Sequence, residues 1–212
     1  MSDTIGNIAL NMAFILYLVH YFPQLLTNRK VDNLEHLSLH FHGMLSICYL
    51  GDLIYGFGMG MPWQYRCVST MGSCCLLIQH WQLHKIHHLN PLYQKYSVAL
   101  LVMLLLFLYE LLFEGSQSVY LTVGYLSHLA GIGYLIPVLF NNWVNKLTHA
   151  LNWKYVSMNW LCYFLNCISA YCLQWPMPSK IGLAFGLFCL TSLLCQGLLY
   201  RSSTELAKSV TK

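Results

Sequence analysis

Charged residues are scarce in this sequence. Its 212 residues include 11 Lys and Arg and 7 Asp and Glu, so that 8% of the side chains are charged while 57% are hydrophobic. Soluble domains carry about 25% charged residues, and a solvated surface cannot be built from so few. The composition therefore excludes an ordinary soluble protein and favours a membrane protein.

Long polar stretches are lacking as well. Apolar runs of spanning length, which is roughly 17 to 25 residues, cover residues 5–22, 39–59, 64–83, 96–113, 119–140, 156–174 and 180–200. These runs are continuous, whereas the strands of a transmembrane barrel alternate in hydropathy, and in lipid each helix pairs its own backbone groups. We therefore predict an all-α fold. The chain should be a polytopic membrane protein with seven transmembrane helices.

Several processing and ligand motifs are also missing. The N-terminal segment has no basic n-region and no small-residue cleavage site, so we expect residues 5–22 to be retained as the first helix. No Asn-x-Ser/Thr acceptor occurs, and no cysteine pair has zinc-finger spacing. Nearly all of the nine cysteines fall inside predicted spans, where they act as small apolar residues and not as a disulfide framework.

The basic residues are distributed unevenly between the predicted spans. Arg66 and Lys180 fall on one side of the membrane, and the other side holds Arg29, Lys30, Lys85, Lys95, Lys146, Lys154, Arg201, Lys208 and Lys212. By the positive-inside rule the second group is cytosolic. We expect a luminal or external N-terminus and a cytosolic C-terminus. The net charge of +4 follows from this bias, and we expect no nucleic-acid partner.

An internal repeat relates the two halves of the chain at an offset of 114 residues. The offset aligns these pairs: Pro23 with Pro137, Asn28 with Asn142, Met44 with Met158, Cys48 with Cys162, Tyr49 with Tyr163, Asp52 with Asn166, and Pro62 with Pro176. Chance likeness between apolar segments is the alternative. We predict a first three-helix repeat (1–94), a linking helix (95–115), and a second three-helix repeat with a short cytosolic tail (116–212). Two parallel repeats in this 3+1+3 order are typical of transporters with a midplane site between the halves.

A proline lies near the cytosolic end of the first helix of each repeat. Pro23 and Pro137 each remove a backbone donor and clash with the preceding turn, which predicts a kink or break at each position. Two symmetry-related kinks would serve as two hinges, with Gln24 beside the first. A protein that alternates access needs such points, whereas a static bundle does not.

The segments around these prolines resemble the PQ-loop repeat family. In that family a Pro-Gln pair ends the first helix of a three-helix unit and a Leu-Ser pair opens the next, as in YFPQLLTN followed by HLSLHF here. The matching positions are Pro23, Gln24, Leu37 and Ser38 in the first copy, and Pro137, Val138, Leu151 and Asn152 in the second. The second copy therefore departs from the family pattern at two of its four positions, Val138 and Asn152.

Other segments are similar to particular members of this family. YLGDLIY (49–55) and FLNCISAY (164–171) look like the Gly-Asp and Gly-Asn segments of the lysosomal cationic amino-acid exporters, more than like the corresponding segments of cystinosin. LLIQHW (76–81) and LLCQGLLYR (193–201) are similar to the Gln-bearing third helix of each unit. The resemblance implies proton-coupled export of an amino acid to the cytosol, in an endolysosomal or a bacterial inner membrane. SWEET sugar carriers share the architecture, so the fold alone does not decide the substrate.

Polar residues inside the predicted spans are the candidates for a solute and proton site. A bare carboxylate at Asp52 would cost roughly 2.5–3.5 kcal/mol in the bilayer, so we expect it to face a cavity or carry a proton. Asn166, its repeat mate, keeps the hydrogen-bonding capacity without the charge and suits a solute. Gln79 and Gln196 in the third helices are further solute-binding candidates. Each of these residues would alternatively serve interhelical packing.

A histidine and two tyrosines in the fifth span could line the same cavity. His128 is a second candidate for proton coupling because histidine titrates near neutral pH. Tyr125 and Tyr134 share its helix face and are candidate solute-binding residues. A neutral histidine that only packs is the alternative.

Two histidine-rich segments raise a different function class. HLSLH (36–40) and HKIHH (84–88) look like the histidine boxes of membrane di-iron enzymes, since imidazoles at positions i, i+3 and i+4 share a helix face. A third box is missing, so we favour solvated histidines in cytosolic loops over a metalloenzyme, with a regulatory zinc site as the other alternative.

The sequence thus predicts a transporter, not an enzyme, whose partners are an amino acid, protons and the lipid bilayer. We expect no cofactor and no metal. A membrane metalloenzyme, a non-transporting receptor or scaffold and a SWEET-like sugar carrier remain the alternatives.

Overall fold

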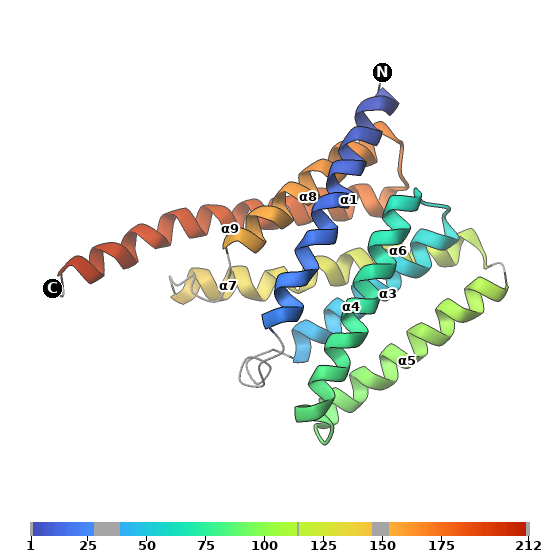
Figure 1. The fold of residues 1–212 in the computed structure, drawn as a ribbon, viewed down its shortest axis with the longest axis horizontal. Coiled ribbons are helices and arrows are strands. Elements are labelled where there is room, and N and C mark those ends of the chain that lie inside the picture. Colours follow the sequence, from blue (N-terminus) through green and yellow to red (C-terminus); the bar gives the residue numbers. More distant parts are fainter. Residues whose placement is uncertain (1, 28–38, 114, 146–152, 211–212) are drawn as a thin grey trace.

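The computed structural model describes residues 2–27, 39–113, 115–145 and 153–210. Within these ranges the regular structure is helical and no strand occurs. The helices form one bundle, in which one helix, α5, lies on the outside (Figure 1).

Eight helical segments make up the described chain. They are α1 (Ser2–Thr27), α3 (Leu39–Gly58), α4 (Trp63–His87), α5 (Pro91–Leu112), α6 (Gln117–Gly133), α7 (Leu135–Asn145), α8 (Trp153–Cys172) and α9 (Met177–Val210). Each predicted span coincides with one of these helices, except that the fifth is divided between α6 and α7 by Tyr134 alone. The all-α, seven-helix fold class is confirmed.

The outer surface of the bundle is apolar while parts of its interior are polar. On α4, Gln64 and Gln79 are buried, whereas Ile78 and Trp81 are exposed; on α5, Leu105 is 55% exposed. This distribution is the reverse of that in a soluble protein, where large apolar side chains turn inward. The exposed face therefore matches lipid, and the chain is an integral membrane protein.

Four helical stretches of the described chain are long and apolar enough to cross a membrane by length and composition. They are Ser2–Val19, Pro91–Glu110, Gln117–Val144 and Met177–Tyr200. The other three long helices, α3, α4 and α8, bury polar side chains such as Ser46, Gln64 and Asn166. Their lower hydropathy reflects a polar inner face, because a helix inside a bundle needs apolar residues only where it meets lipid.

The helix contacts repeat at the same offset as the sequence. Helices α1, α3 and α4 correspond to α6, α8 and α9. Helix α1 packs on α8, and its counterpart α6 packs on α3. In the same way, the contact between α3 and α4 corresponds to the contact between α8 and α9, and the contact between α1 and α4 corresponds to that between α6 and α9. Helix α5 packs against α3 as the extra, linking helix.

The turns that join α3 to α4 and α8 to α9 share one geometry. Gly60 (φ 60°) and its repeat mate Gln174 (φ 53°) are the residues of the described chain with a left-handed φ. Such a residue after a helix closes a Schellman motif with a 6→1 hydrogen bond. These bonds run from Met61 N to Gly56 O at 2.9 Å and from Trp175 N to Ala170 O at 3.0 Å.

The two prolines expected to act as hinges lie in different settings. Pro23 is inside α1, which continues to Thr27, so α1 is not broken at this proline, and a kink there stays a prediction. A proline removes only its own intrahelical hydrogen bond, and α1 tolerates that loss. Pro137 lies in the first turn of α7, just after the interruption at Tyr134, where an N–H would have no intrahelical partner. The side chain of Gln24 lies outside the described part of the structure.

Candidate functional site

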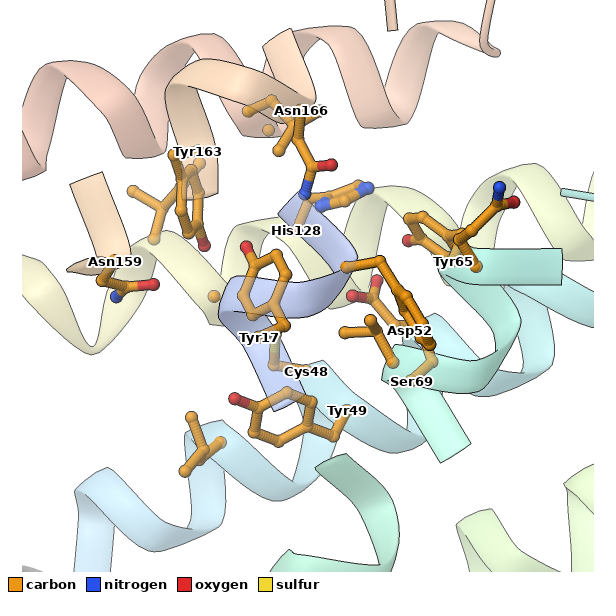
Figure 2. A pocket seen from close by; sticks show the side chains of 18 of the residues that line it. Tyr17, Cys48, Tyr49, Asp52, Tyr65, Ser69, His128, Asn159, Tyr163 and Asn166 are labelled. Atoms are coloured by element: carbon orange, nitrogen blue, oxygen red, sulfur yellow. The ribbon is translucent and has the colours of Figure 1, made fainter. Parts of the chain in front are cut away.

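A pocket lies at the centre of the bundle between the two sets of three helices. Its volume is about 90 Å³, and six helices line it: α1, α3, α4, α6, α8 and α9. In Figure 2, α3 contributes Asp52 and Tyr49 from one side, and α8 contributes Asn166 and Tyr163 from the other. Pockets for drug-sized ligands are roughly 300–1,000 Å³, so this pocket is smaller than those.

Most of the lining consists of residues that the repeat relates to each other. Seven pairs 114 residues apart line the pocket: Phe14 and His128, Tyr17 and Gly131, Leu45 and Asn159, Tyr49 and Tyr163, Asp52 and Asn166, Val68 and Gly182, and Ser69 and Leu183. The pocket therefore lies between the repeats and receives equivalent helix faces from both. Because the paired residues are mostly different in type, the two halves of the pocket differ in chemistry.

Asp52 meets the second repeat through Ser127. The Ser127 hydroxyl, buried on α6, is in hydrogen-bond contact with Asp52 Oδ1 and lies 2.9 Å from the backbone oxygen of Cys48. Gly51 allows this approach, since a Cβ there would lie 2.8 Å from the Ser127 Cβ. The contact joins α3 to α6 at the pocket wall.

Ser127 Oγ has two acceptors within reach, the Asp52 carboxyl group and the Cys48 backbone oxygen. A serine hydroxyl donates one hydrogen bond and accepts others. Ser127 on α6 is therefore the hydrogen-bonding link between the Asp52 side chain and the backbone of α3.

His128 lies on α6 against α9. Its ring packs edge-on against Tyr55, with ring centroids 6.0 Å apart. Gly182 gives it room, since a Cβ there would lie 2.5 Å from His128 Cγ. The Nε2 of His128 is buried without a hydrogen-bond partner in the described structure. His128 lines the pocket, so this nitrogen has unused capacity for a water molecule or a solute.

The second repeat contributes amides to the pocket. Asn159 and Asn166, both on α8, are buried and line it. No Lys or Arg is among the lining residues described, whereas Asp52 brings a carboxyl group. The electrostatics of the pocket therefore favour a neutral or positively charged guest.

One end of the pocket is sealed by contacts between the repeats. The Tyr55 hydroxyl on α3 lies 2.9 Å from Ser179 Oγ on α9. Around this bond a buried cluster brings together Leu10, Tyr55, Met61, Ala170, Trp175 and Leu183. Tyr65 packs edge-on against Trp175 with centroids 5.4 Å apart. The seal thus lies at the end of the bundle where the two Schellman turns occur.

Four of the residues expected at a solute or proton site line this pocket: Asp52, His128, Asn166 and Tyr134. The other three candidates do not line it. Tyr125 is 42% exposed, Gln79 is buried on α4, and Gln196 donates through Nε2 to the Leu139 oxygen at 3.0 Å. The Gln196 amide therefore stabilises the backbone of α7.

Sequence reasoning missed several lining residues. These are Tyr17, Tyr49, Tyr65, Ser69, Asn159 and Tyr163, together with Ser127, which contacts Asp52. The offset of 114 residues was a usable signal for some of them, because it pairs Tyr49 with Tyr163. No comparable signal marked Tyr65 or Ser127.

The histidine boxes do not assemble into a metal centre in the described residues. No group of three His, Cys, Asp or Glu side chains lies close enough there to hold an ion. His36 lies outside the described residues, and His40 Nδ1 is bonded to the Tyr96 hydroxyl at 3.0 Å.

Comparisons with known proteins agree with this architecture. No protein-family model and no curated protein sequence matches the chain. A solved structure of a eukaryotic SWEET transporter, determined at 3.7 Å resolution, is similar with a TM-score of 0.71 and 16% sequence identity. The similarity covers 95% of this chain and 99% of the transporter chain. The chain has the fold of a SWEET transporter.

Proposed function

We propose that this chain is a solute carrier of the PQ-loop type. It moves a small polar solute by alternating access, in which the units 1–94 and 116–212 rock about the central pocket. The single observation that supports this most strongly is that the pocket is lined by seven pairs of repeat mates. A cavity shared by two equivalent halves is the arrangement that alternating access requires.

Asp52 is the proposed proton-coupling group. It is the acidic side chain among the described lining residues, and its contact with Ser127 joins α3 to α6, so a proton gained or lost there acts on the contact between the two sets of helices. His128, whose Nε2 is unpartnered, is the second candidate for this role.

The proposed solute is an amino acid, and a cationic one fits the charges best. The lining offers a carboxyl group, two amides and several tyrosines and no basic residue, so a positive side chain finds a partner there. The resemblance to the lysosomal cationic exporters points to transport toward the cytosol, from an endolysosomal or bacterial compartment. Pro23 and Pro137 are proposed as hinges, with Pro137 at the junction of α6 and α7.

A sugar is the second candidate solute. Tyr17, Tyr49 and Tyr163 present aromatic rings to the pocket, and Asn159 and Asn166 present amides. Rings and neutral hydrogen-bonding groups of this kind suit a polyhydroxy compound, and the fold is that of a SWEET transporter.

The test is uptake of labelled amino acids and sugars into proteoliposomes, with and without an inwardly directed proton gradient. Asp52→Asn keeps the shape of the side chain and removes its titration. We expect the variant to lose gradient-driven accumulation while it still exchanges solute. Asp3→Asn is the matched control, because Asp3 is exposed at the start of α1 and does not line the pocket.

Either of two results would contradict the proposal. Gradient-driven accumulation by Asp52→Asn at the wild-type level would remove Asp52 from coupling. Absence of saturable flux of every solute in wild-type vesicles, with correctly folded protein, would favour a receptor or scaffold that uses the same fold.

A further inference from the structure

A groove separates the last turns of α4 from the start of α5, away from the central pocket. It is shallow and open, with a volume of about 510 Å³, and its lining consists of Leu77, His80, Trp81, His84, His88, Tyr93, Gln94, Ser97 and Val98. The α4 helix continues one turn beyond the predicted span end at residue 83, which places His84 on the helix and His88 at its C-cap. The expectation that the histidine-box residues lie in cytosolic loops is therefore wrong for His84 and His87, and also for His40, which lies in α3.

His80 is the most buried of the three groove histidines, and both of its ring nitrogens already make hydrogen bonds. Ser97 Oγ donates to the Tyr93 oxygen (2.9 Å), so it accepts from His80 Nε2–H at 3.0 Å. His80 Nδ1 then has no proton and accepts from His42 Nε2–H at 2.9 Å. Both ring nitrogens of His80 are committed to the contact between α3, α4 and α5.

His84 and His88 are different, because both are exposed and their ring nitrogens make no hydrogen bond within the described structure. Residues four apart on a helix lie on one face. Their ring centroids are 5.6 Å apart, with the planes tilted by 50°. The two imidazoles thus lie over one turn of helix at the mouth of the groove.

This separation suits two ligands of one metal ion. With Zn–N bonds of about 2.0–2.1 Å and a tetrahedral angle, the centroids of two ligating imidazoles lie roughly 5.2 Å apart. The observed separation of 5.6 Å differs from that value by a few tenths of an ångström. Small rotations of exposed side chains are sufficient to close the difference.

The local charges favour a cation despite a nearby lysine. His88 caps the C-terminus of α4, where the unpaired carbonyl groups carry partial negative charge. Lys85 does not line the groove, and its Nζ lies 4.4 Å from the centroid of the Trp81 ring in a cation–π contact. Gln94 also lines the groove, and it donates through Nε2 to the His88 backbone oxygen at 3.2 Å, so its Oε1 is not used in that bond.

We propose that His84 and His88 form a binding site for a divalent transition-metal ion such as Zn²⁺ or Cu²⁺. The two imidazoles supply nitrogen ligands, and water molecules with Gln94 Oε1 complete the coordination. Imidazole is a preferred ligand of both ions. A metal bound in this way connects the end of α4 to α5 and stiffens the linking helix against the first repeat. The site is independent of the proposed transport function.

The experiment uses the untagged full-length protein in detergent, with ZnCl₂ or CuCl₂ as the only added ligand. Isothermal titration gives the stoichiometry and affinity, and Cu²⁺ electron paramagnetic resonance counts the ligating nitrogens. We expect one ion per chain and a two-nitrogen spectrum. His84→Ala and His88→Ala should each weaken binding by at least about tenfold. Acidification should release the ion, because protonated imidazole is not a ligand.

His87→Ala is the matched control, since His87 is on the same turn but does not line the groove. Its binding should equal that of the wild type. Thermal melting without metal establishes that each variant is folded. The proposal is overturned if the folded double variant His84→Ala, His88→Ala binds as tightly as the wild type, if His87→Ala weakens binding equally, or if the spectrum shows one nitrogen.

Discussion

Gly182 provides a test of the central pocket that changes no ionisable group. A Cβ at this position would lie 2.5 Å from His128 Cγ and 2.6 Å from both His128 Cβ and Nδ1. Carbon atoms in contact are normally about 3.5–4.0 Å apart, so Gly182→Ala forces a displacement of about 1 Å. The clash falls on the base of the side chain, so α6 and α9 must separate or the imidazole must leave its place.

Overpacking of this kind costs about 1–3 kcal/mol. If the strain falls on the closed, solute-bound state, the half-saturation concentration for uptake rises by roughly 5- to 150-fold. If it falls on the whole fold, the melting temperature of the purified protein drops instead. Uptake in proteoliposomes and thermal melting of the same preparation separate these two effects.

Gly133→Ala is the control for this prediction. Its Cβ would meet only the thioether end of Met44, with Sδ at 3.3 Å and Cε at 3.5 Å. Methionine adapts readily to such a change, so uptake and melting should stay close to those of the wild type. The reasoning fails if Gly182→Ala matches the wild type in both assays, or if the two variants are equally impaired.

Two further predictions concern the Asp52 contact and one turn. Ser127→Ala removes the donor shared by Asp52 and a backbone carbonyl, and should lower the free energy of unfolding by about 1–3 kcal/mol. Denaturant unfolding in detergent measures this change. An unchanged midpoint would mean that water replaces the hydroxyl. Gln174→Gly should raise that free energy by about 1 kcal/mol, because a left-handed φ costs a side chain roughly that much. Gly60→Ala, at the repeat mate, should act in the opposite direction, and equal signs for the two variants would contradict the strain argument.

The helical fold was largely predictable from the sequence. Each apolar run became a helix because in lipid a chain segment must pair its own backbone groups, which allows few alternatives. The offset of 114 residues agrees with the helix contacts, since α1, α3 and α4 pack with one another and with the rest as α6, α8 and α9 do. The end of α4 was missed by one turn, because polar histidines continue a helix beyond its membrane-spanning part.

The pocket was predictable only in part. Asp52 and Asn166 stood out because a polar residue in an apolar run needs a partner or a cavity. Gln196 had the same appearance in the sequence, yet its amide binds the Leu139 oxygen instead of facing the pocket. Composition indicates that a polar group must be satisfied, but it does not say by which neighbour.

The sequence by itself determined that the chain lies in a membrane, that its segments are helical, and that its halves repeat, because these depend on local hydropathy and spacing. Only the tertiary structure decided which face of each helix turns inward. That choice depends on close approaches between distant segments, such as Gly51 against Ser127 and Gly182 against His128. Those approaches place one carboxyl group, two amides and several tyrosines around a single small cavity.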